Sequence, residues 1–292
     1  MNHVLAVDLG GTKTAIAFVD QSGRQAGKRT LPAARGVEAS IAQMAACLKE
    51  SRASAAGIVV PGIYDPASGE AWAPNLWGQD RVPLRALAAE RLGLPVVISS
   101  DRSGYVLGEQ WMGAARGIED VMYVSVGTGI GVGILSGGRL VEGAHGIAGA
   151  AGWMVVGGPW QEEYRDAGGW EYEAAGPAVA RRAGMPNAEA VAAAARDGDQ
   201  RSLAVMQQTA DFLALGVANL ISVLNPAMVV LGGGVLQAGD LLFERVRRNA
   251  LRWTQPVAAR MTRIEMTMLG EDAGLLGAAR LAWQQVGLHT ED

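Results

Sequence analysis

A pattern of strand, glycine turn and strand occurs twice in the chain, at residues 4–18 (VLAVDLGGTKTAIAF) and at residues 122–135 (MYVSVGTGIGVGIL). In each copy a short apolar run typical of a buried strand leads into a glycine turn, and a second apolar run follows. Glycine at such a turn lets backbone N–H groups approach an anion without a Cβ in the way. The repeat therefore predicts two similar lobes, each presenting a phosphate-binding turn to a shared cleft.

The segments around these two patterns alternate between strands and helices, which is typical of a layered α/β fold. Residues 21–24 are predicted to close the first hairpin. We expect an N-terminal lobe over residues 1–115, a C-terminal lobe over 116–274, and a final helix at about 275–290 that packs on the N-terminal lobe. Periodicity and turn residues predict a strand that ends in a Pro-Gly turn at 57–62, a strand with a glycine turn at 228–235, and strands at 94–101 and 263–269. They predict helices at 36–50, 83–93, 102–112, 199–225, 239–251 and 273–286.

Composition limits the partners and the location that we expect. The 292 residues carry a formal net charge of −4 with a pI near 5.5, which argues against a broad basic surface for nucleic acid or anionic membranes. The N-terminus enters a strand pattern at once and has an aspartate within its apolar run, unlike a signal peptide. No apolar stretch reaches the roughly 18 residues of a membrane span. We therefore expect a cytoplasmic protein.

The single cysteine, Cys47, excludes a disulfide within the chain and a cysteine-only metal site. Cys47 lies in an amphipathic helical pattern, which predicts a core thiol. The three histidines, His3, His145 and His289, are too far apart in the sequence to suggest a histidine metal site.

The first glycine turn carries groups suited to a nucleotide. Gly10 and Gly11 leave their backbone N–H groups accessible to a phosphate, and Thr12 and Lys13 add hydrogen-bond donors. Asp8 at the strand end can hold the water shell of Mg²⁺. A plain hairpin would explain this turn equally well on its own. The second copy, Gly127-Thr128-Gly129, favours a nucleotide, because two facing turns would hold its β- and γ-phosphates from both sides.

Two further positions allow two interpretations each. Gly232 and Gly233, with Gly234, follow an apolar strand and suit either a flat surface for a purine ring or a simple strand-to-helix turn. Asp101 follows a buried strand and precedes a helix. It suits a general base at the floor of a cleft and suits a helix N-cap equally well.

An ordered set of motifs along the chain resembles the ROK family of sugar kinases and repressors. The motifs are DLGGTKTAIAFVD, VVPGIYDPASGEAWAPNL, SSDRSGYVLGEQ, VSVGTGIGVGILSGGRLVEGAHGIAG, NPAMVVLGGGV and EDAGLLGAA, which together run from about residue 4 to residue 281. The resemblance implies a two-lobed, actin-like or ribonuclease H-like ATPase fold with an interlobe cleft, and a homodimer. Repressor members have a DNA-binding domain before the first phosphate turn. Only three residues precede the first strand here, so we expect a kinase and no nucleic-acid partner.

Roles transfer to the positions that match these motifs. The resemblance implies ATP and Mg²⁺ as cofactors, with Asp101 as the base that activates a sugar hydroxyl, most simply a C6 hydroxymethyl. The loops do not distinguish ATP from another nucleotide or from polyphosphate. The implied nucleotide and metal residues are Asp8, Gly10, Gly11 and Thr12 in the first turn, Thr128 and Gly129 in the second, and Gly232 and Gly233 for adenosine.

The implied sugar site departs from the family pattern. The family's asparagine before the catalytic aspartate is Ser100 here, and Ala150 and Trp153 stand in place of its sugar-binding glutamate and histidine. A second sugar-binding glutamate survives as Glu171, and Gly62 and Asn75 also match. We therefore expect a substrate other than ordinary glucose, such as an amino sugar, a deoxy sugar or a cyclic polyol.

The same segment holds structural zinc in many family members, through that histidine and three cysteines. The cysteine positions fall on Glu162, Tyr164 and Gly169 here, so we expect no zinc. Aromatic packing is the replacement that we predict, from Trp153, Trp160, Tyr164 and Trp170. Stacking of Trp153 or Trp160 on a sugar is the alternative. The rival to a kinase is a catalytically silent sensor that binds sugar or nucleotide, although such a protein would have no need of Asp101.

Overall fold

The computed structural model describes residues 3–49 and 51–288, and the chain forms two compact units. The first unit comprises Met1–Gly117, Leu140–Ile147 and Glu271–Asp292, and the second comprises Ile118–Arg139 and Ala148–Gly270. The chain thus returns to the first unit twice after leaving it. His289 and the end of the predicted final helix lie outside the described residues, as does Glu50 at the end of the helix predicted at 36–50.

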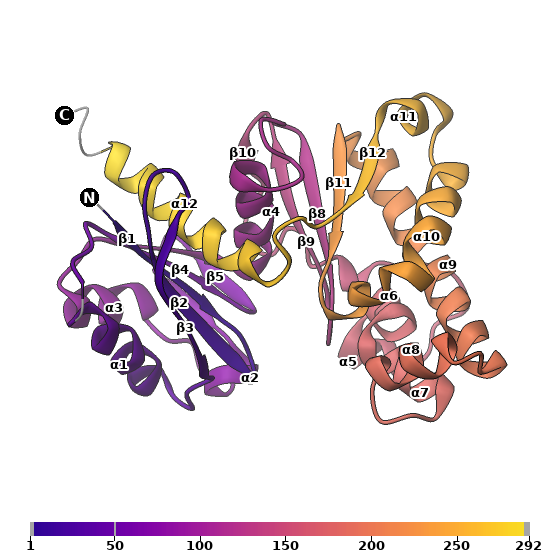
Figure 1. Ribbon diagram of the computed structural model, residues 1–292, viewed down its shortest axis with the longest axis horizontal. Helices are drawn as coiled ribbons and strands as arrows, with labels where there is room; N and C mark the ends of the chain where they lie inside the picture. Colours follow the sequence, from indigo (N-terminus) through magenta and orange to yellow (C-terminus); the bar gives the residue numbers. More distant parts are fainter. Residues whose placement is uncertain (1–2, 50, 289–292) are drawn as a thin grey trace. The chain divides into compact units, whose positions relative to one another are not determined.

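Each unit contains a five-stranded sheet, and the two sheets have the same topology (Figure 1). In each, the first strand pairs antiparallel with the second and parallel with a later strand. The predicted repeat is thereby confirmed, because residues 4–18 and 122–135 occupy equivalent places in the two sheets. The first sheet has the order β3 (Gln25–Pro32), β2 (Lys13–Val19), β1 (Val4–Leu9), β4 (Ala56–Val60) and β7 (Val96–Ser100), and the second has β10 (Arg139–Leu140), β9 (Ile130–Ser136), β8 (Val121–Val126), β11 (Met228–Gly232) and β12 (Arg263–Met266).

The predicted helices are all present, with ends that differ from the prediction by a few residues. The small hairpin β5 (Ile63–Asp65) and β6 (Glu70–Trp72), several short helices and the 3₁₀ turns were not predicted. The first unit contains α1 (Val37–Leu48), α2 (Pro74–Trp77), α3 (Leu84–Leu92), α4 (Asp101–Met112), η3 (Gly270–Asp272, at the boundary) and α12 (Ala273–Leu288). The second contains η1 (Ala151–Trp153), α5 (Tyr164–Ala167), α6 (Gly169–Ala174), α7 (Gly176–Ala183), α8 (Ala188–Arg196), α9 (Gln200–Leu224), η2 (Gly234–Ala238), α10 (Gly239–Trp253) and α11 (Pro256–Met261).

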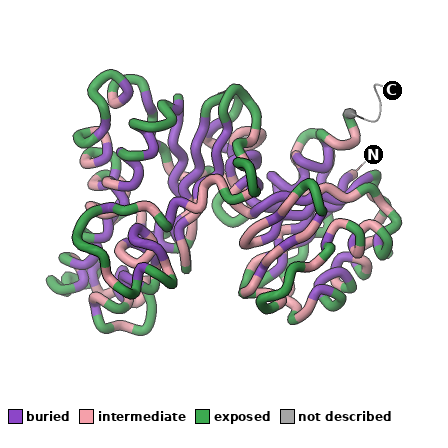
Figure 2. The backbone as a smooth tube through the Cα atoms, turned by 180° about the vertical axis from the view of Figure 1, so that it is seen from behind, coloured by how far each residue is buried: buried purple, intermediate pink, exposed green. Residues whose placement is uncertain are grey.

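Helices cover both faces of the first sheet (Figure 1). Leu5 and Val7 of β1 join a core with α1 and α3, which includes Cys47, as predicted. Ala6 is fully buried as well, and residues along a strand alternate between faces, so it lies on the opposite face, where α12 packs. Figure 2 shows the central strands of this sheet as buried, whereas the edge strand β3 is exposed over most of its length.

Helix α12 packs so closely that backbone meets backbone. A Cβ on Gly57 of β4 would lie 1.8 Å from the Ala278 carbonyl oxygen, and one on Gly277 would lie 1.8 Å from the Gly104 oxygen of α4. Only glycine fits at either position, because real Cβ atoms do not approach other atoms so closely. Helix α12 is therefore fixed in position against both β4 and α4.

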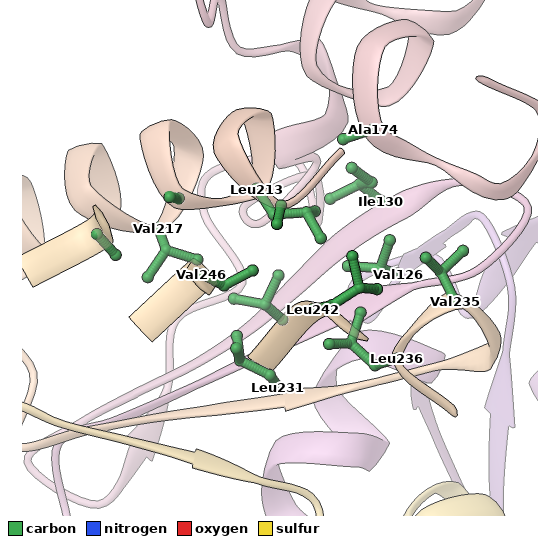
Figure 3. Close-up of a cluster of buried hydrophobic side chains, with 14 of the residues drawn as sticks. Val126, Ile130, Ala174, Leu213, Val217, Leu231, Val235, Leu236, Leu242 and Val246 are labelled. Atoms are coloured by element: carbon green, nitrogen blue, oxygen red, sulfur yellow. The ribbon is translucent and has the colours of Figure 1, made fainter. Parts of the chain in front are cut away.

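The second sheet packs against α9 and α10 over an aliphatic core. Val126, Leu213, Val217 and Leu242 come from β8, α9 and α10 and point toward one another (Figure 3). This core supports the strands on either side of the second glycine turn. None of the described helices has the length and apolar composition needed to span a bilayer.

Candidate active site

The first glycine turn is a tight connection between β1 and β2. The Gly10 N–H donates to the Lys13 carbonyl oxygen at 2.9 Å, and a Cβ on Gly10 would lie 2.7 Å from that same oxygen. No atom lies within 4 Å of the Cβ position of Gly11, and Thr12 and Lys13 are exposed. The Lys13 Nζ pairs with Glu271 at 2.7 Å. The turn therefore presents an open backbone with one cation beside it.

Asp101 is the first residue of α4, and it is not the helix cap. The cap is Ser100, whose Oγ accepts a hydrogen bond from the Ser103 N–H at 3.3 Å. Asp101 instead accepts from the Arg102 N–H at 2.7 Å. Burial raises the pKa of the Asp101 carboxyl, against a lowering by the charge of Arg102. Of the two interpretations left open by the sequence, the N-cap is wrong.

Asp8 and Asp101 lie in the same unit, and the negative charge of Asp101 acts on the Asp8 carboxyl. Burial, and after it the negative charge of Asp101, raises the pKa of Asp8 to about 7, against a lowering by Lys13. Gly274 adjoins Asp8, since a Cβ there would lie 2.3 Å from the Asp8 Oδ2. A pair of carboxylates that repel each other in a partly buried place suits a hard divalent cation such as Mg²⁺. The donor set therefore fits the predicted metal.

The other predicted sugar-site residues of the first unit differ in their exposure to solvent. Asn75 is exposed on α2, whereas Gly62 has φ 95° and a Cβ there would lie 2.2 Å from the Trp72 carbonyl oxygen. Ser100 is buried, and its hydroxyl is 3.1 Å from the Ser103 hydroxyl. Capping α4 is the role of Ser100 that the structure shows.

Sequence reasoning missed a segment that contacts the neighbours of Asp101. Residues 140–147 return to the first unit, where Glu142 accepts a hydrogen bond from the Ser99 Oγ at 2.9 Å. The Arg102 Nη2 lies 3.4 Å from the Gly146 carbonyl oxygen. These contacts join residues more than 40 positions apart, and no local pattern in the sequence indicates them.

The second glycine turn is supported by Glu171. The Gly127 N–H donates to the Gly129 oxygen at 2.9 Å, and Thr128 at the tip is exposed. The Glu171 Oε2 accepts a hydrogen bond from the Ile130 N–H, directly after the turn, at 2.7 Å. A Cβ on Gly129 would lie 2.5 Å from the same carboxylate oxygen. Burial raises the pKa of Glu171, and the bond from Ile130 lowers it. The structure thus brings Thr128, Gly129 and Glu171 together.

The third glycine turn lies beside the second. A Cβ on Gly233, which has φ 97°, would lie 2.5 Å from the Val126 carbonyl oxygen at the end of β8. A Cβ on Gly232 would lie 2.0 Å from the Tyr123 Oη. The turn leads directly into η2 and α10, so it is a strand-to-helix connection whatever else it binds.

The prediction that the aromatic side chains pack together is right for some of them and wrong for others. Trp170 is fully buried, donates from Nε1 to the Phe212 oxygen at 3.0 Å and lies against Gly216, and Tyr164 is 6% exposed. Trp153 and Trp160 are 59% and 65% exposed, so their area contributes little to the core. Trp160 only meets the edge of Tyr164, with ring centroids 5.9 Å apart. Ala150 precedes η1, and Trp153 ends it.

No cluster of three or more His, Cys, Asp or Glu side chains suited to a metal ion occurs within residues 3–49 and 51–288. The positions of the family's zinc ligands carry instead a buried tyrosine, Tyr164, an exposed glutamate, Glu162, and a buried glycine, Gly169.

Comparison with known proteins agrees with the fold and the motifs. The family model described as "ROK family" matches residues 4–285, and the chain belongs to the ROK family. It is 32% identical to a glucokinase of Thermotoga maritima over 97% of this chain and 98% of that protein. It is 35% identical to a bifunctional NanE/NanK enzyme of Brucella suis over 96% of this chain and 53% of that longer protein. A xylose repressor of Caldicellulosiruptor bescii is 30% identical over 76% of this chain and 60% of its own length.

Solved structures confirm the architecture. A ROK hexokinase from Thermus thermophilus matches with a TM-score of 0.83 and 31% identity over 98% of this chain and 99% of that one. A ROK glucokinase from Streptomyces griseus, solved with glucose and AMPPNP, matches with a TM-score of 0.81 and 29% identity over 97% of this chain and all of that one. The fold is the two-lobed actin-like fold of ROK sugar kinases, as predicted.

Proposed function

We propose that this protein transfers the γ-phosphoryl group of ATP, with Mg²⁺, to a hydroxyl of a sugar or sugar-like polyol. The observation that carries the proposal is Asp101, a partly buried carboxylate with a raised pKa in the first turn of α4. It lies in a ROK chain whose relatives include a glucokinase and a NanE/NanK enzyme. A base of this kind is what an alcohol phosphotransferase needs.

The roles follow from the residues. Asp101 accepts the proton of the attacking hydroxyl, and its raised pKa makes it a stronger base than an exposed aspartate. The open backbone at Gly11 and the turn at Thr128 bind the phosphates, and Gly232 and Gly233 receive the adenosine. Asp8 would hold Mg²⁺ through water, and the ion would neutralise charge on the phosphoryl group. Positioning and electrostatics then account for most of the catalysis.

The sugar contacts are expected to come from Glu171, Asn75 and the backbone near Gly62, with Ser100 and Asp101 at the reacting end. Ala150 offers no polar group, and Trp153 presents an exposed ring. Each unpaired hydroxyl of a bound sugar costs about 1–3 kcal/mol. We therefore favour a substrate with fewer or differently placed hydroxyls, and an apolar face that Trp153 can cover.

The test is ATP consumption with a panel of hexoses, N-acetylated and amino sugars, deoxy sugars and cyclic polyols. We expect turnover that depends on the acceptor, with a substrate other than glucose giving the highest kcat/KM. Glucose as clearly the best substrate would contradict the proposed substrate class and leave the kinase assignment standing. Absence of turnover with every acceptor, together with clean ATP binding, would contradict the kinase assignment itself.

Restoring the family's sugar-binding glutamate and histidine at positions 150 and 153 should shift the substrate preference toward glucose. In an Ala150→Glu, Trp153→His double variant, we expect kcat/KM for glucose to rise about tenfold or more, because each restored partner is worth about 1–3 kcal/mol. The kcat/KM for the panel's best substrate should fall. Trp160→His is the matched control, since Trp160 is equally exposed in the same segment. An equal effect of the control would contradict a specific role of positions 150 and 153.

A second candidate function is a sensor that binds sugar or nucleotide without turnover. The xylose repressor among the relatives and the loss of two polar sugar contacts favour it. Retention of Asp101 with a raised pKa favours the kinase. The panel separates the two, because a sensor binds its ligand without consuming ATP.

A further inference from the structure

Glu173 lies at the centre of a partly buried polar network that the candidate site does not use. The Tyr164 Oη donates to the Glu173 Oε1 at 2.8 Å, and the Arg182 Nη2 pairs with the Glu173 Oε2. The Gln161 Nε2 donates to the Tyr164 Oη at 2.9 Å. The Arg182 and Glu173 side chains are only 15% and 14% exposed. Both carboxylate oxygens of Glu173 are thus engaged, which makes removal of one partner costly.

Aromatic rings enclose this Glu173 network, which we define as Tyr164, Glu173 and Arg182. The Tyr164 and Tyr172 rings meet edge to face with centroids 5.4 Å apart. The Arg182 guanidinium lies 4.9 Å from the centroid of Phe212. Burial and the neighbouring Glu173 raise the pKa of Tyr164 to about 12, so its hydroxyl remains a donor at neutral pH.

The network joins three consecutive helices, two of which make hydrogen bonds to the second glycine turn. Tyr164 begins α5, Glu173 lies on α6 and Arg182 lies on α7. Glu171, on α6 as well, accepts from the Ile130 N–H at one end of the turn. Gly176, the first residue of α7, donates its N–H to the Gly127 oxygen at the other end, at 2.8 Å. Both ends of the turn are therefore held by the helices that Glu173 connects.

We propose that Glu173 is a positioning residue that fixes α6 and α7 and, through Glu171 and Gly176, the shape of the turn Gly127-Thr128-Gly129. This inference rests on the proposed function, in which that turn binds phosphate. Tyr164 stands where the family resemblance places a zinc cysteine, so the network occupies the place of a metal site. A hydrogen-bonded ion pair replaces the metal as the constraint on these short helices.

Amide hydrogen exchange tests the inference without any need for catalysis. In Glu173→Gln, we expect the Ile130 amide to exchange at least about tenfold faster, because its acceptor is no longer held in place. Tyr164→Phe keeps the ion pair between Arg182 and Glu173, so the Ile130 amide should exchange faster by a smaller factor. This variant provides the test if Glu173→Gln fails to fold. Glu162→Gln is the matched control, because Glu162 pairs with Arg165 in the same segment with both side chains exposed.

Steady-state kinetics test whether the Glu173 network affects the use of ATP. The kcat/KM for ATP should fall about tenfold in Glu173→Gln and stay unchanged in Glu162→Gln, since a displaced turn binds the transferring phosphates less well. A merely structural role would lower the melting temperature and leave kcat/KM unchanged. Ile130 exchange equal to that of the control would overturn the inference, and so would faster exchange with unchanged kcat/KM. If the unmodified protein turns over no acceptor, the proposed function fails. Ile130 exchange and the affinity for AMPPNP then decide the inference.

Discussion

Replacement of Asp101 by asparagine is expected to reduce kcat by about 10²–10⁴-fold, the usual contribution of a general base. Asparagine keeps the shape of the side chain but cannot accept the proton of the attacking hydroxyl. The KM for ATP should change little. Stability should not fall, because burial disfavours the charge that the substitution removes. Steady-state rates on the best acceptor of the panel, with thermal unfolding alongside, measure both.

Asp20→Asn is the control for this experiment. Asp20 lies in the β2–β3 hairpin of the same unit, where its carboxylate accepts hydrogen bonds from Ser22 and Arg24. We expect its kcat to match that of the unmodified protein. An Asp101→Asn variant that keeps a kcat within about threefold of the control would contradict the assignment of Asp101 as the base.

The substitution Gly277→Ala is expected to destabilise the first unit by about 3 kcal/mol or more. The added Cβ would lie 1.8 Å from the Gly104 carbonyl oxygen and 2.6 Å from its Cα. Both atoms belong to backbone that has no rotamer to change, so α12 and α4 must move apart. This loss outweighs the roughly 1 kcal/mol that alanine gains over glycine within a helix. Urea unfolding followed by circular dichroism measures the difference.

Gly287→Ala provides the matched comparison, because it makes the same change in the same helix. No atom lies within 4 Å of the Cβ position of Gly287. We expect a neutral effect or a gain of up to about 1 kcal/mol. Equal free energies of unfolding for Gly277→Ala and Gly287→Ala would contradict the prediction, because they would show that α12 and α4 can move apart without loss of stability.

The strands and glycine turns were predictable from the sequence because their signals are local. The run 4–18 carries its periodicity and its turn residues within itself, and so does 122–135. The repeat of these two runs predicted two similar lobes, and the family motifs added the actin-like fold, which periodicity alone does not specify. Residues around α5 to α8 were not assigned, since these helices are only four to nine residues long and give too few turns to establish a period. Their ends depend on tertiary packing.

The site was less predictable, because its contacts join distant residues. The sequence could not decide whether Asp101 caps α4, and the structure shows that Ser100, one position earlier, does so. The bond between Glu171 and Ile130 spans 41 positions and has no local signal. The sequence shows how much apolar surface the tryptophans carry, but not whether each side chain points into the core or toward solvent. Trp153 and Trp160 were therefore wrongly expected to be buried.

The packing of α12 has a consequence for the order in which the chain folds during synthesis. Gly57 of β4 has no side chain, and the space is filled by the carbonyl group of Ala278, a residue that the ribosome adds 221 positions later. The second unit, by contrast, is complete in sequence by Gly270. Although domains often fold in the order of translation, here the amino-terminal sheet must wait with one face uncovered while the later unit closes first.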